Sequence, residues 1–378
     1  MTIATSEVEL VAEFNSKRVL GKVHFSRIPV HSGKVKIFGN LRVQGQYSMH
    51  IREFPVKFIG PSTEVCQPLH LGNIFDPRNA MKIAKYESTC TKNHSACAVG
   101  DLAGKFGSQT SKFEMSDGDL HLSGPESIFG RSLTIRNSTG NIIACATIRS
   151  VSSVKTVVGI FRAVSPGIAG TIVLRQSGAN PSSDTSVDIN LVLVDARSES
   201  KNGLFLAVHE NAVTGDKEGS CSSVGEVFNP LAKTSCDKRK PSTCPIGDLS
   251  AKLGSIDIPL PESGPSRSFF IDSNLPLSGK DSVVGRSLMI SENGQPLMCT
   301  TIQEYQEVEA EVRFNGEQGL NGIIGLKQVS MYEPAVVNMS ISGINGIYEH
   351  QLPAGPSCLI SKPGDYWWNI TGMILGNV

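Results

Sequence analysis

The sequence has few aromatic residues, no net charge and no long hydrophobic segment. Aromatic residues make up 6% of its 378 residues, and 35 basic side chains balance 35 acidic ones. A net charge of zero gives no electrostatic reason to expect a nucleic acid or a charged membrane surface as partner. The apolar runs are far shorter than a membrane span. We therefore expect a soluble protein that binds neither nucleic acid nor membrane.

What the chain has in quantity is turn residues, with 37 Gly and 20 Pro. Between Gly33 and Phe54, apolar and polar positions alternate, and the same pattern recurs from Leu120 to Asn137. A period of two that is interrupted by turn residues every eight to ten positions is typical of antiparallel strands. Helical periodicity is almost absent. These features predict an all-β fold, either a sandwich or a barrel.

A long internal repeat organises the chain. Ten residues of the segment 120–135 recur 155 positions later in the segment 275–290, with the same spacing, and Gly100-Asp101-Leu102 recurs as Gly247-Asp248-Leu249. A third copy begins near Val312. Self-similarity of this kind indicates tandem homologous domains. We predict repeat 1 at residues 1–152, repeat 2 at 153–306 and a partial, truncated third repeat at 307–378.

The nine cysteines follow the same repetition. Each complete repeat holds one distant and one close pair, which predicts two disulfides per repeat rather than a metal cluster. We expect Cys358 to be unpaired in this sequence, because the repeat would place its partner beyond Val378. The predicted pairs are Cys66–Cys145, Cys90–Cys97, Cys221–Cys299 and Cys236–Cys244.

Disulfides and glycosylation sequons predict an extracellular, secreted glycoprotein. The sequons are at Asn93, Asn137, Asn338 and Asn369. No signal peptide is visible, because the first 20 residues lack an apolar core and carry Glu7, Glu9 and Glu13.

A series of short motifs then identifies a family. Repeat 1 contains His50-Ile51-Arg52-Glu53, Cys66, Phe75-Asp76-Pro77, Val99-Gly100-Asp101-Leu102, Gly130-Arg131 and Ala144-Cys145, and repeat 2 contains the matching series in the same order. This order and spacing resemble the copper/zinc superoxide dismutase family, and the tandem arrangement is most similar to its copper-only repeat proteins. The resemblance implies an eight-stranded Greek-key β-barrel or sandwich for each repeat.

The resemblance also implies where a copper ion would be held. The family supplies four histidines, because several imidazoles hold copper through its redox cycle. Neither complete repeat retains more than one of them. The corresponding positions are His50, Arg52, Ile74 and Arg136 in repeat 1, Ala207, His209, Val227 and Ser291 in repeat 2, and Tyr348, His350 and Gly364 in the partial third repeat.

The zinc site implied by the family is degenerate as well. Ala98 and Pro245 replace a histidine, and only the carboxylates Asp101 and Asp248 remain. A carboxylate in a Gly-Asp-Leu turn also serves its own loop by accepting backbone hydrogen bonds, and we favour that structural role. Arg52 and Arg136 would both point into the former copper pocket, where we expect an internal salt bridge or, as the less favoured alternative, a small bound anion.

These observations favour catalytically degenerate, superoxide dismutase-like modules with a structural or binding role. We expect no cofactor, or copper if any. One alternative is a copper-dependent superoxide dismutase that acts through a relocated site at His50 and His70 or through repeats outside this chain. A second is a weak copper buffer. Adjacent repeats of the chain are the expected partners, with pseudo-dimer packing between them, and no other protein partner can be named.

Overall fold

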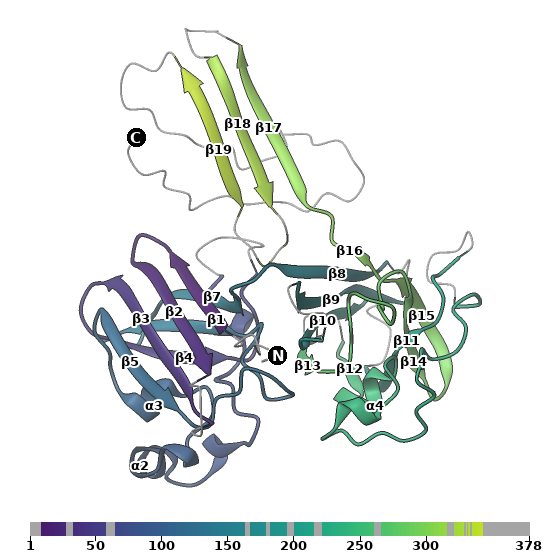
Figure 1. The fold of residues 1–378 in the computed structure, drawn as a ribbon, viewed down its shortest axis with the longest axis horizontal. Helices are drawn as coiled ribbons and strands as arrows, with labels where there is room; N and C mark the ends of the chain where they lie inside the picture. Colours follow the sequence, from purple (N-terminus) through teal and green to yellow (C-terminus); the bar gives the residue numbers. More distant parts are fainter. Residues whose placement is uncertain are drawn as a thin grey trace, which may run out of the picture.

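Three β-sheet units follow one another along the chain (Figure 1). The computed structural model describes residues 9–27, 33–57, 65–162, 167–178, 182–194, 200–214, 221–260, 266–315, 321–328, 330, 332 and 335–342. His350, Cys358, Asn369, Tyr348 and Gly364 lie outside the described residues.

Repeat 1 forms one curled antiparallel sheet of seven strands, in the order β4-β6-β7-β1-β2-β3-β5. Alternate residues of β2 and β3, among them Val23, Phe25 and Ile37, are fully buried, which is the pattern expected where one face of a sheet covers a core. The strands are β1 (Glu9–Asn15), β2 (Val19–Arg27), β3 (Val35–Val43), β4 (Tyr47–Arg52), β5 (Lys112–Asp117), β6 (Ser132–Asn137) and β7 (Ile142–Ser150).

Repeat 2 uses the same strand neighbours in two sheets, ordered β13-β10-β9-β8-β16 and β12-β11-β14-β15. A second apolar core lies between these sheets, and Ile271 of β13 packs into the core of repeat 1. The strands are β8 (Val154–Phe161), β9 (Ile168–Ser177), β10 (Thr185–Leu193), β11 (Lys201–His209), β12 (Ile256–Ile258), β13 (Ser266–Asp272), β14 (Ser287–Glu292), β15 (Gln295–Thr301) and β16 (Gln303–Glu304).

The predicted all-β fold is confirmed, although the strand count departs from the eight that the resemblance implies. The described residues form seven strands in repeat 1 and nine in repeat 2. The additional strands of repeat 2 are the three-residue β12 and the two-residue β16, which extend the edges of its sheets. Strand neighbours agree between the repeats, because β5-β3-β2-β1 and β4-β6-β7 correspond to β13-β10-β9-β8 and β11-β14-β15.

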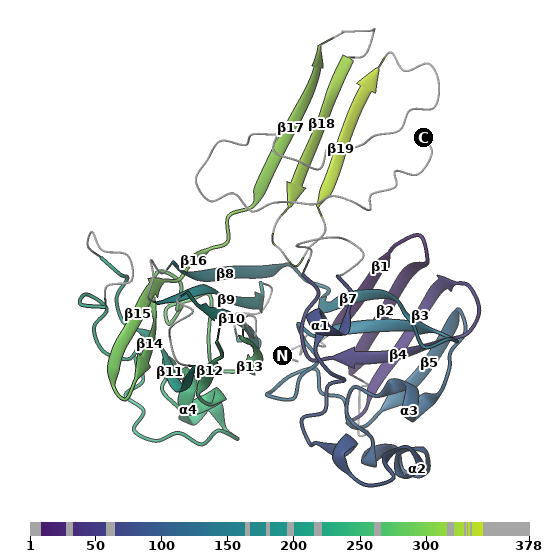
Figure 2. The ribbon, with the colours of Figure 1, turned by 180° about the vertical axis from the view of Figure 1, so that it is seen from behind.

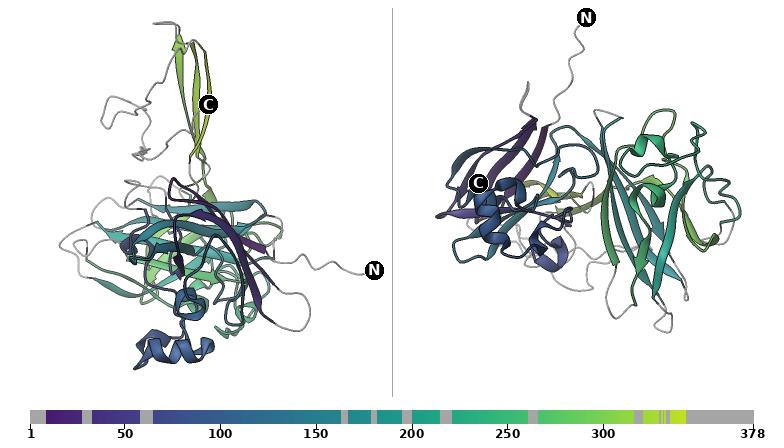
Figure 3. Two further views of the ribbon diagram at one scale, coloured as in Figure 1. Left: turned by 90° about the vertical axis from the view of Figure 1, so that its left-hand side faces the viewer. Right: turned by 90° about the horizontal axis from the view of Figure 1, so that it is seen from below.

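The helices are short and lie in the loops that cover the barrels (Figure 3). None in the described part of the chain is long and apolar enough to cross a membrane. They are α1 (Pro68–Leu71), η1 (Ala80–Lys82), α2 (Tyr86–Lys92), η2 (His94–Ala96), α3 (Leu102–Phe106), η3 (Pro241–Thr243) and α4 (Leu249–Leu253).

All four predicted disulfides are present. Cys66–Cys145 and Cys221–Cys299 join residues 79 and 78 positions apart, whereas Cys90–Cys97 and Cys236–Cys244 close loops of only 7 and 8. The long pairs tie a loop to the last main strand of each barrel, β7 and β15. The duplicated cysteine pattern therefore reflects duplicated covalent connections.

The repeats contact one another around the buried carboxylate of Asp188 on β10. Lys57 of repeat 1 lies 3.1 Å from this carboxylate, and Tyr332, beyond repeat 2, donates a hydrogen bond of 2.6 Å to it. Arg267 on β13 pairs with Asp188 at 3.2 Å and also donates hydrogen bonds to the carbonyls of His70 and Pro55 in repeat 1. Contacts from three parts of the chain therefore meet at one residue.

After repeat 2, the chain forms a three-stranded antiparallel sheet that extends away from the other two units (Figure 2). Its strands are β17 (Val308–Asn315), β18 (Asn321–Gln328) and β19 (Val336–Ser342), and β18 lies in the middle.

Candidate functional site

Strand pairing brings the four positions of the family's copper site together in both repeats. In repeat 1, β4 carries His50 and Arg52, and Arg136 lies on the neighbouring β6, where it faces Ser48. Arg52 forms an isolated bridge with Ile74, and His209 of repeat 2 forms the same bridge with Val227. The two pockets therefore have equivalent backbones, and they differ in their side chains.

A glycine in each repeat allows three segments to meet beside this pocket. The amide of Ile51 donates to the carbonyl of Gly100, the amide of Gly100 donates to Phe75, and the amide of Phe75 donates to Ile51. A Cβ atom on Gly100 would lie 2.3 Å from the carbonyl oxygen of Ile51. Val208, Phe228 and Gly247 repeat all three bonds in repeat 2. This close approach explains why only glycine serves at that position.

The arginine of the Gly-Arg motif contacts the same loops in each repeat. Arg131 donates hydrogen bonds to the carbonyls of Glu53 and Ser127, and its guanidinium lies 3.6 Å from the centre of the Phe75 ring. Arg286 makes the corresponding contacts with Glu210, Ser282 and the ring of Phe228. The Gly-Arg motif is therefore used to hold backbone and not to reach into the pocket.

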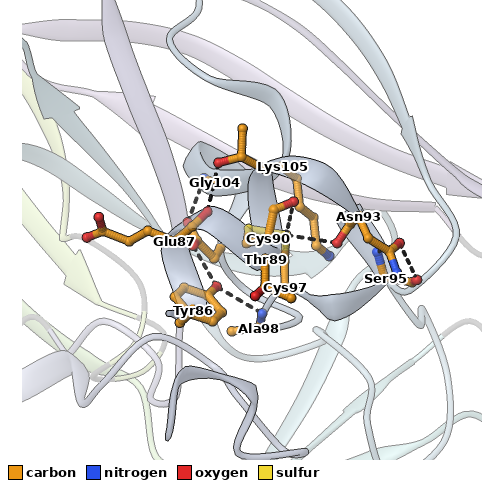
Figure 4. The surroundings of a disulfide bond; sticks show 12 residues. Tyr86, Glu87, Thr89, Cys90, Asn93, Ser95, Cys97, Ala98, Gly104 and Lys105 are labelled. Carbon is orange, nitrogen blue, oxygen red and sulfur yellow. Dashed lines mark hydrogen bonds between the residues drawn. A yellow bond between two sulfur atoms is a disulfide. The ribbon is translucent and has the colours of Figure 1, made fainter. Parts of the chain in front are cut away.

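Both carboxylate oxygens of Asp101 accept hydrogen bonds from nearby loop residues. One carboxylate oxygen accepts a hydrogen bond of 2.8 Å from the amide of Gly104 and so caps α3, and the other accepts 2.7 Å from the hydroxyl of Tyr86. Tyr86 in turn accepts from the amide of Ala98, next to the Cys90–Cys97 disulfide (Figure 4). Asp248 caps α4 in repeat 2 through the amide of Ala251. Both surviving zinc-site carboxylates thus have a structural function.

His50 lies in a buried and electropositive environment. Its side chain is 10% exposed, its Nε2 atom is 3.5 Å from Asp101, and its Nδ1 atom has no hydrogen-bond partner among the described residues. Burial lowers the pKa of His50 from 6.5 to about 4, opposed by Asp101 and reinforced by Arg136 and Arg52. The imidazole is therefore neutral at neutral pH.

Repeat 2 retains one imidazole in the equivalent pocket. The Nδ1 atom of His209 lies 2.8 Å from the carbonyl oxygen of Gly225, and its Nε2 atom has no partner in the described part of the chain. Of the other positions that correspond to the family's copper site, Ala207 lies on β11, Ser291 lies on β14 and Val227 forms the bridge with His209. None of these four side chains is an arginine, a lysine or a carboxylate.

These side chains do not fit a catalytic copper ion. A guanidinium has no lone pair to offer a metal and stays protonated, and the side chains of Ile74, Val227 and Ala207 have no donor atom. Within the described residues, no cluster of three or more His, Cys, Asp and Glu side chains is arranged to hold a metal ion. His70, the partner in a relocated site, is exposed on α1.

The favoured salt bridge in the repeat 1 pocket is not formed. Neither Arg52 nor Arg136 has a carboxylate within 4 Å in the part of the chain that the structure describes; Arg52 instead donates from Nη1 to the carbonyl of Gly72 at 2.9 Å. Asp101 is held by Tyr86 and Gly104, and a Glu53 oxygen accepts from the amide of Asn73. The available carboxylates are therefore engaged with the loops.

Sequence reasoning missed several buried polar groups. Lys105 pairs with Asp117 at 2.8 Å, and Lys252 pairs with Asp272 in repeat 2. The internal repeat could have revealed both pairs, because each residue has a copy in the other repeat. The Asp188 junction has no such signal, because Phe38 occupies the register position of Asp188 in repeat 1.

Three of the four predicted glycosylation sequons fall on described residues. Asn93 and Asn338 are exposed and Asn137 is partly buried, with its side chain engaged in the turn that joins β6 and β7. Their modification stays a prediction.

Comparison with known proteins supports the resemblance. The model of the copper/zinc superoxide dismutase family matches residues 168–315. The cell surface superoxide dismutase [Cu-Zn] 6 of Candida albicans is 30% identical over 129 residues, which cover 33% of this chain and 39% of that protein. The chain thus matches about two fifths of that relative's length.

Two further matches cover a single domain. Superoxide dismutase [Cu-Zn] of Schizosaccharomyces pombe is 29% identical over 159 residues, covering 42% of this chain and 90% of that protein. Among solved structures, Candida albicans superoxide dismutase 5 with Cu(II) is 24% identical, covers 41% of this chain and 94% of its own, and has a TM-score of 0.33.

Proposed function

We propose that the chain belongs to the copper/zinc superoxide dismutase family and that its two complete repeats are non-catalytic extracellular modules with degenerate copper and zinc sites. The observation that carries the proposal is the exchange of copper ligands for other side chains on an intact scaffold. Arg52 faces Ile74 in one copy and His209 faces Val227 in the other. A redox metal that needs several imidazoles is not retained by one.

The retained residues support a structural role for these modules. Gly100 and Gly247 permit close backbone contacts, Arg131 and Arg286 brace carbonyls, and the disulfides fasten loops to the barrels. Each of these contributes to folding and none requires a metal. Extracellular location is supported by the four disulfides and by the cell surface relative. Packing of adjacent repeats on one another is the partner interaction that we propose.

Decay of superoxide, followed by stopped-flow absorbance after copper loading and gel filtration, tests the proposal. We expect the decay to match the spontaneous rate. A copper-dependent acceleration that a chelator abolishes would instead establish the copper-dependent dismutase. In that case His50→Gln and His70→Gln variants would show whether a relocated site is responsible. Bound copper without acceleration would favour the weak copper buffer.

A further inference from the structure

One face of the β4–β6 strand pair in repeat 1 has an unusual composition. Because strand residues alternate between faces, one side of this pair carries apolar core residues and the other carries polar ones. We call the polar side the β4–β6 face; it consists of Ser48, His50, Arg52, Ser132, Thr134 and Arg136.

The two arginines flank His50 from opposite ends of the β4–β6 face. Arg52 pairs with Ser132 at one end, Arg136 pairs with Ser48 at the other, and His50 lies between them opposite Thr134. Arg52 is only 4% exposed. Burial lowers the pKa of Arg52, and the charge of Arg136 lowers it further, so the two guanidinium groups act on each other.

Hydrogen-bonding atoms without a partner are concentrated on this face. Four of the eight buried side-chain atoms that have no hydrogen-bond partner among the described residues are on the β4–β6 face: His50 Nδ1, Arg52 Nε, Ser132 Oγ and Arg136 Nε. Native proteins leave few such atoms, and a cluster of them requires an explanation. All four groups can donate a hydrogen bond without a change of charge, because a neutral imidazole can carry its proton on Nδ1.

Among the described residues, the Arg52 guanidinium donates a hydrogen bond only from Nη1, to the Gly72 carbonyl, and its Nε edge is left for a ligand. This edge of a guanidinium is suited to two parallel hydrogen bonds with an oxyanion. The nearby carboxylates do not substitute for such a ligand, since Asp101 and Glu53 accept hydrogen bonds from their own loops.

We propose that the β4–β6 face of repeat 1 binds one small inorganic oxyanion of the phosphate or sulfate class, held between Arg52 and Arg136 with Ser132 as an additional donor. The proposal rests on the loss of copper from this pocket. Repeat 2 provides an internal comparison, because His209, Ser287 and Ser291 occupy its positions without an arginine.

His50 lies between the two arginines on this face. The groups that face it are Asp101 from the cap of α3, Arg52 from β4 and Arg136 from β6. Because its Nδ1 atom has no hydrogen-bond partner among the described residues, the neutral imidazole can donate a further hydrogen bond to the anion.

Isothermal titration of inorganic phosphate and of sulfate into the full chain, in a buffer that contains EDTA, tests the proposal. We expect one saturable site per chain, at least a tenfold loss of affinity in Arg136→Met, and a smaller loss in Arg136→Lys. Arg149→Met is the control, because Arg149 is an exposed arginine paired with Glu13 on another strand of the same sheet. Its affinity should equal that of the unaltered chain.

Absence of saturable binding, or equal affinity in Arg136→Met and Arg149→Met, would overturn the proposal and indicate an adventitious ion only. Because Arg136 is partly exposed, its replacement is expected to leave repeat 1 folded, and a thermal unfolding curve checks this. EDTA keeps copper out of the titration, so failure here is distinct from failure of the copper-loading experiment. Acetate in place of phosphate reports whether the site is specific for tetrahedral anions.

Discussion

Repeat 1 and repeat 2 have the same strand neighbours and differ in the charge of the pockets where the resemblance places copper. In repeat 1, two arginines surround a neutral histidine, whereas repeat 2 has one histidine that bonds to a backbone carbonyl. The close contacts of Gly100 and Gly247 and the caps made by Asp101 and Asp248 are the same in both. The two repeats therefore share these scaffold contacts and differ at the positions that the resemblance assigns to copper.

The largest effect that we expect comes from the disulfides. The chain-entropy relation gives a loss of about 4.5 kcal/mol for opening a loop of 78 or 79 residues and about 2.5 kcal/mol for a loop of 7 or 8. Cys66→Ser/Cys145→Ser and Cys221→Ser/Cys299→Ser should thus lower the free energy of unfolding by similar amounts. Cys90→Ser/Cys97→Ser should cost about half as much. Urea unfolding measures all three, and unequal effects of the two long pairs would show that the repeats are not equivalent scaffolds.

The second comparison concerns the contact between the repeats around Asp188. Burial alone would raise the pKa of Asp188, but Lys57 and Arg267 beside it lower that pKa to about 2. Asp188→Ala leaves two cations without their carboxylate, which costs about 4 kcal/mol. Phe38→Ala, at the equivalent register position of repeat 1, should cost less because Phe38 is only partly buried. Equal losses in urea unfolding would contradict the assignment of Asp188 as the junction of the repeats.

The third prediction concerns how the free energy of unfolding depends on pH through His50 in repeat 1. Because the pKa of His50 is about 4 in the folded chain and 6.5 ordinarily, the unfolded chain binds the proton first as the pH falls. The stability that this group contributes is complete above pH 6.5 and is lost between pH 6.5 and 4, by about 3 kcal/mol at 1.36 kcal/mol per pKa unit. His50→Gln should remove this part of the pH dependence. Unfolding curves that coincide for the two chains from pH 7 to 4 would refute the burial of a neutral His50.

The smallest effect concerns two equivalent glycines. Gly130 and Gly285 both have a positive φ, at 77° and 83°, so alanine strains the backbone by about 1 kcal/mol at either position. A Cβ atom on Gly130 would also lie 2.9 Å from the Phe269 ring of repeat 2, whereas Gly285 has open space. Gly130→Ala should therefore cost about 1 kcal/mol more than Gly285→Ala, from the overpacking that it adds. Equal costs in thermal unfolding would argue against this contact between the repeats.

The fold and the cysteine pairs were predictable because they are written twice in the sequence. Period-two patterns set the strands, and the repeated cysteines set the disulfides. The identity of the residues at the former ligand positions was equally accessible, since Arg52, Ile74 and Val227 are read directly from the aligned motifs.

Contacts that have no equivalent in the other repeat could not be predicted from the sequence. Asp188 and Tyr332 meet only because three parts of the chain converge, and Phe38 gives no hint of a carboxylate at that register position. The expected salt bridge of Arg52 failed for a related reason. Its carboxylates are engaged by backbone amides and by Tyr86, and short loop motifs do not reveal such competition.

Copper stoichiometry tests the central claim most directly. The chain is loaded with excess copper, passed over a chelating resin, and assayed for bound metal together with the electron paramagnetic resonance spectrum of Cu(II). Loss of the imidazole ligands predicts well under one copper per chain and no spectrum of nitrogen-coordinated copper. One tightly held copper per chain, with hyperfine structure from several nitrogens that His50→Gln or His209→Gln abolishes, would contradict it.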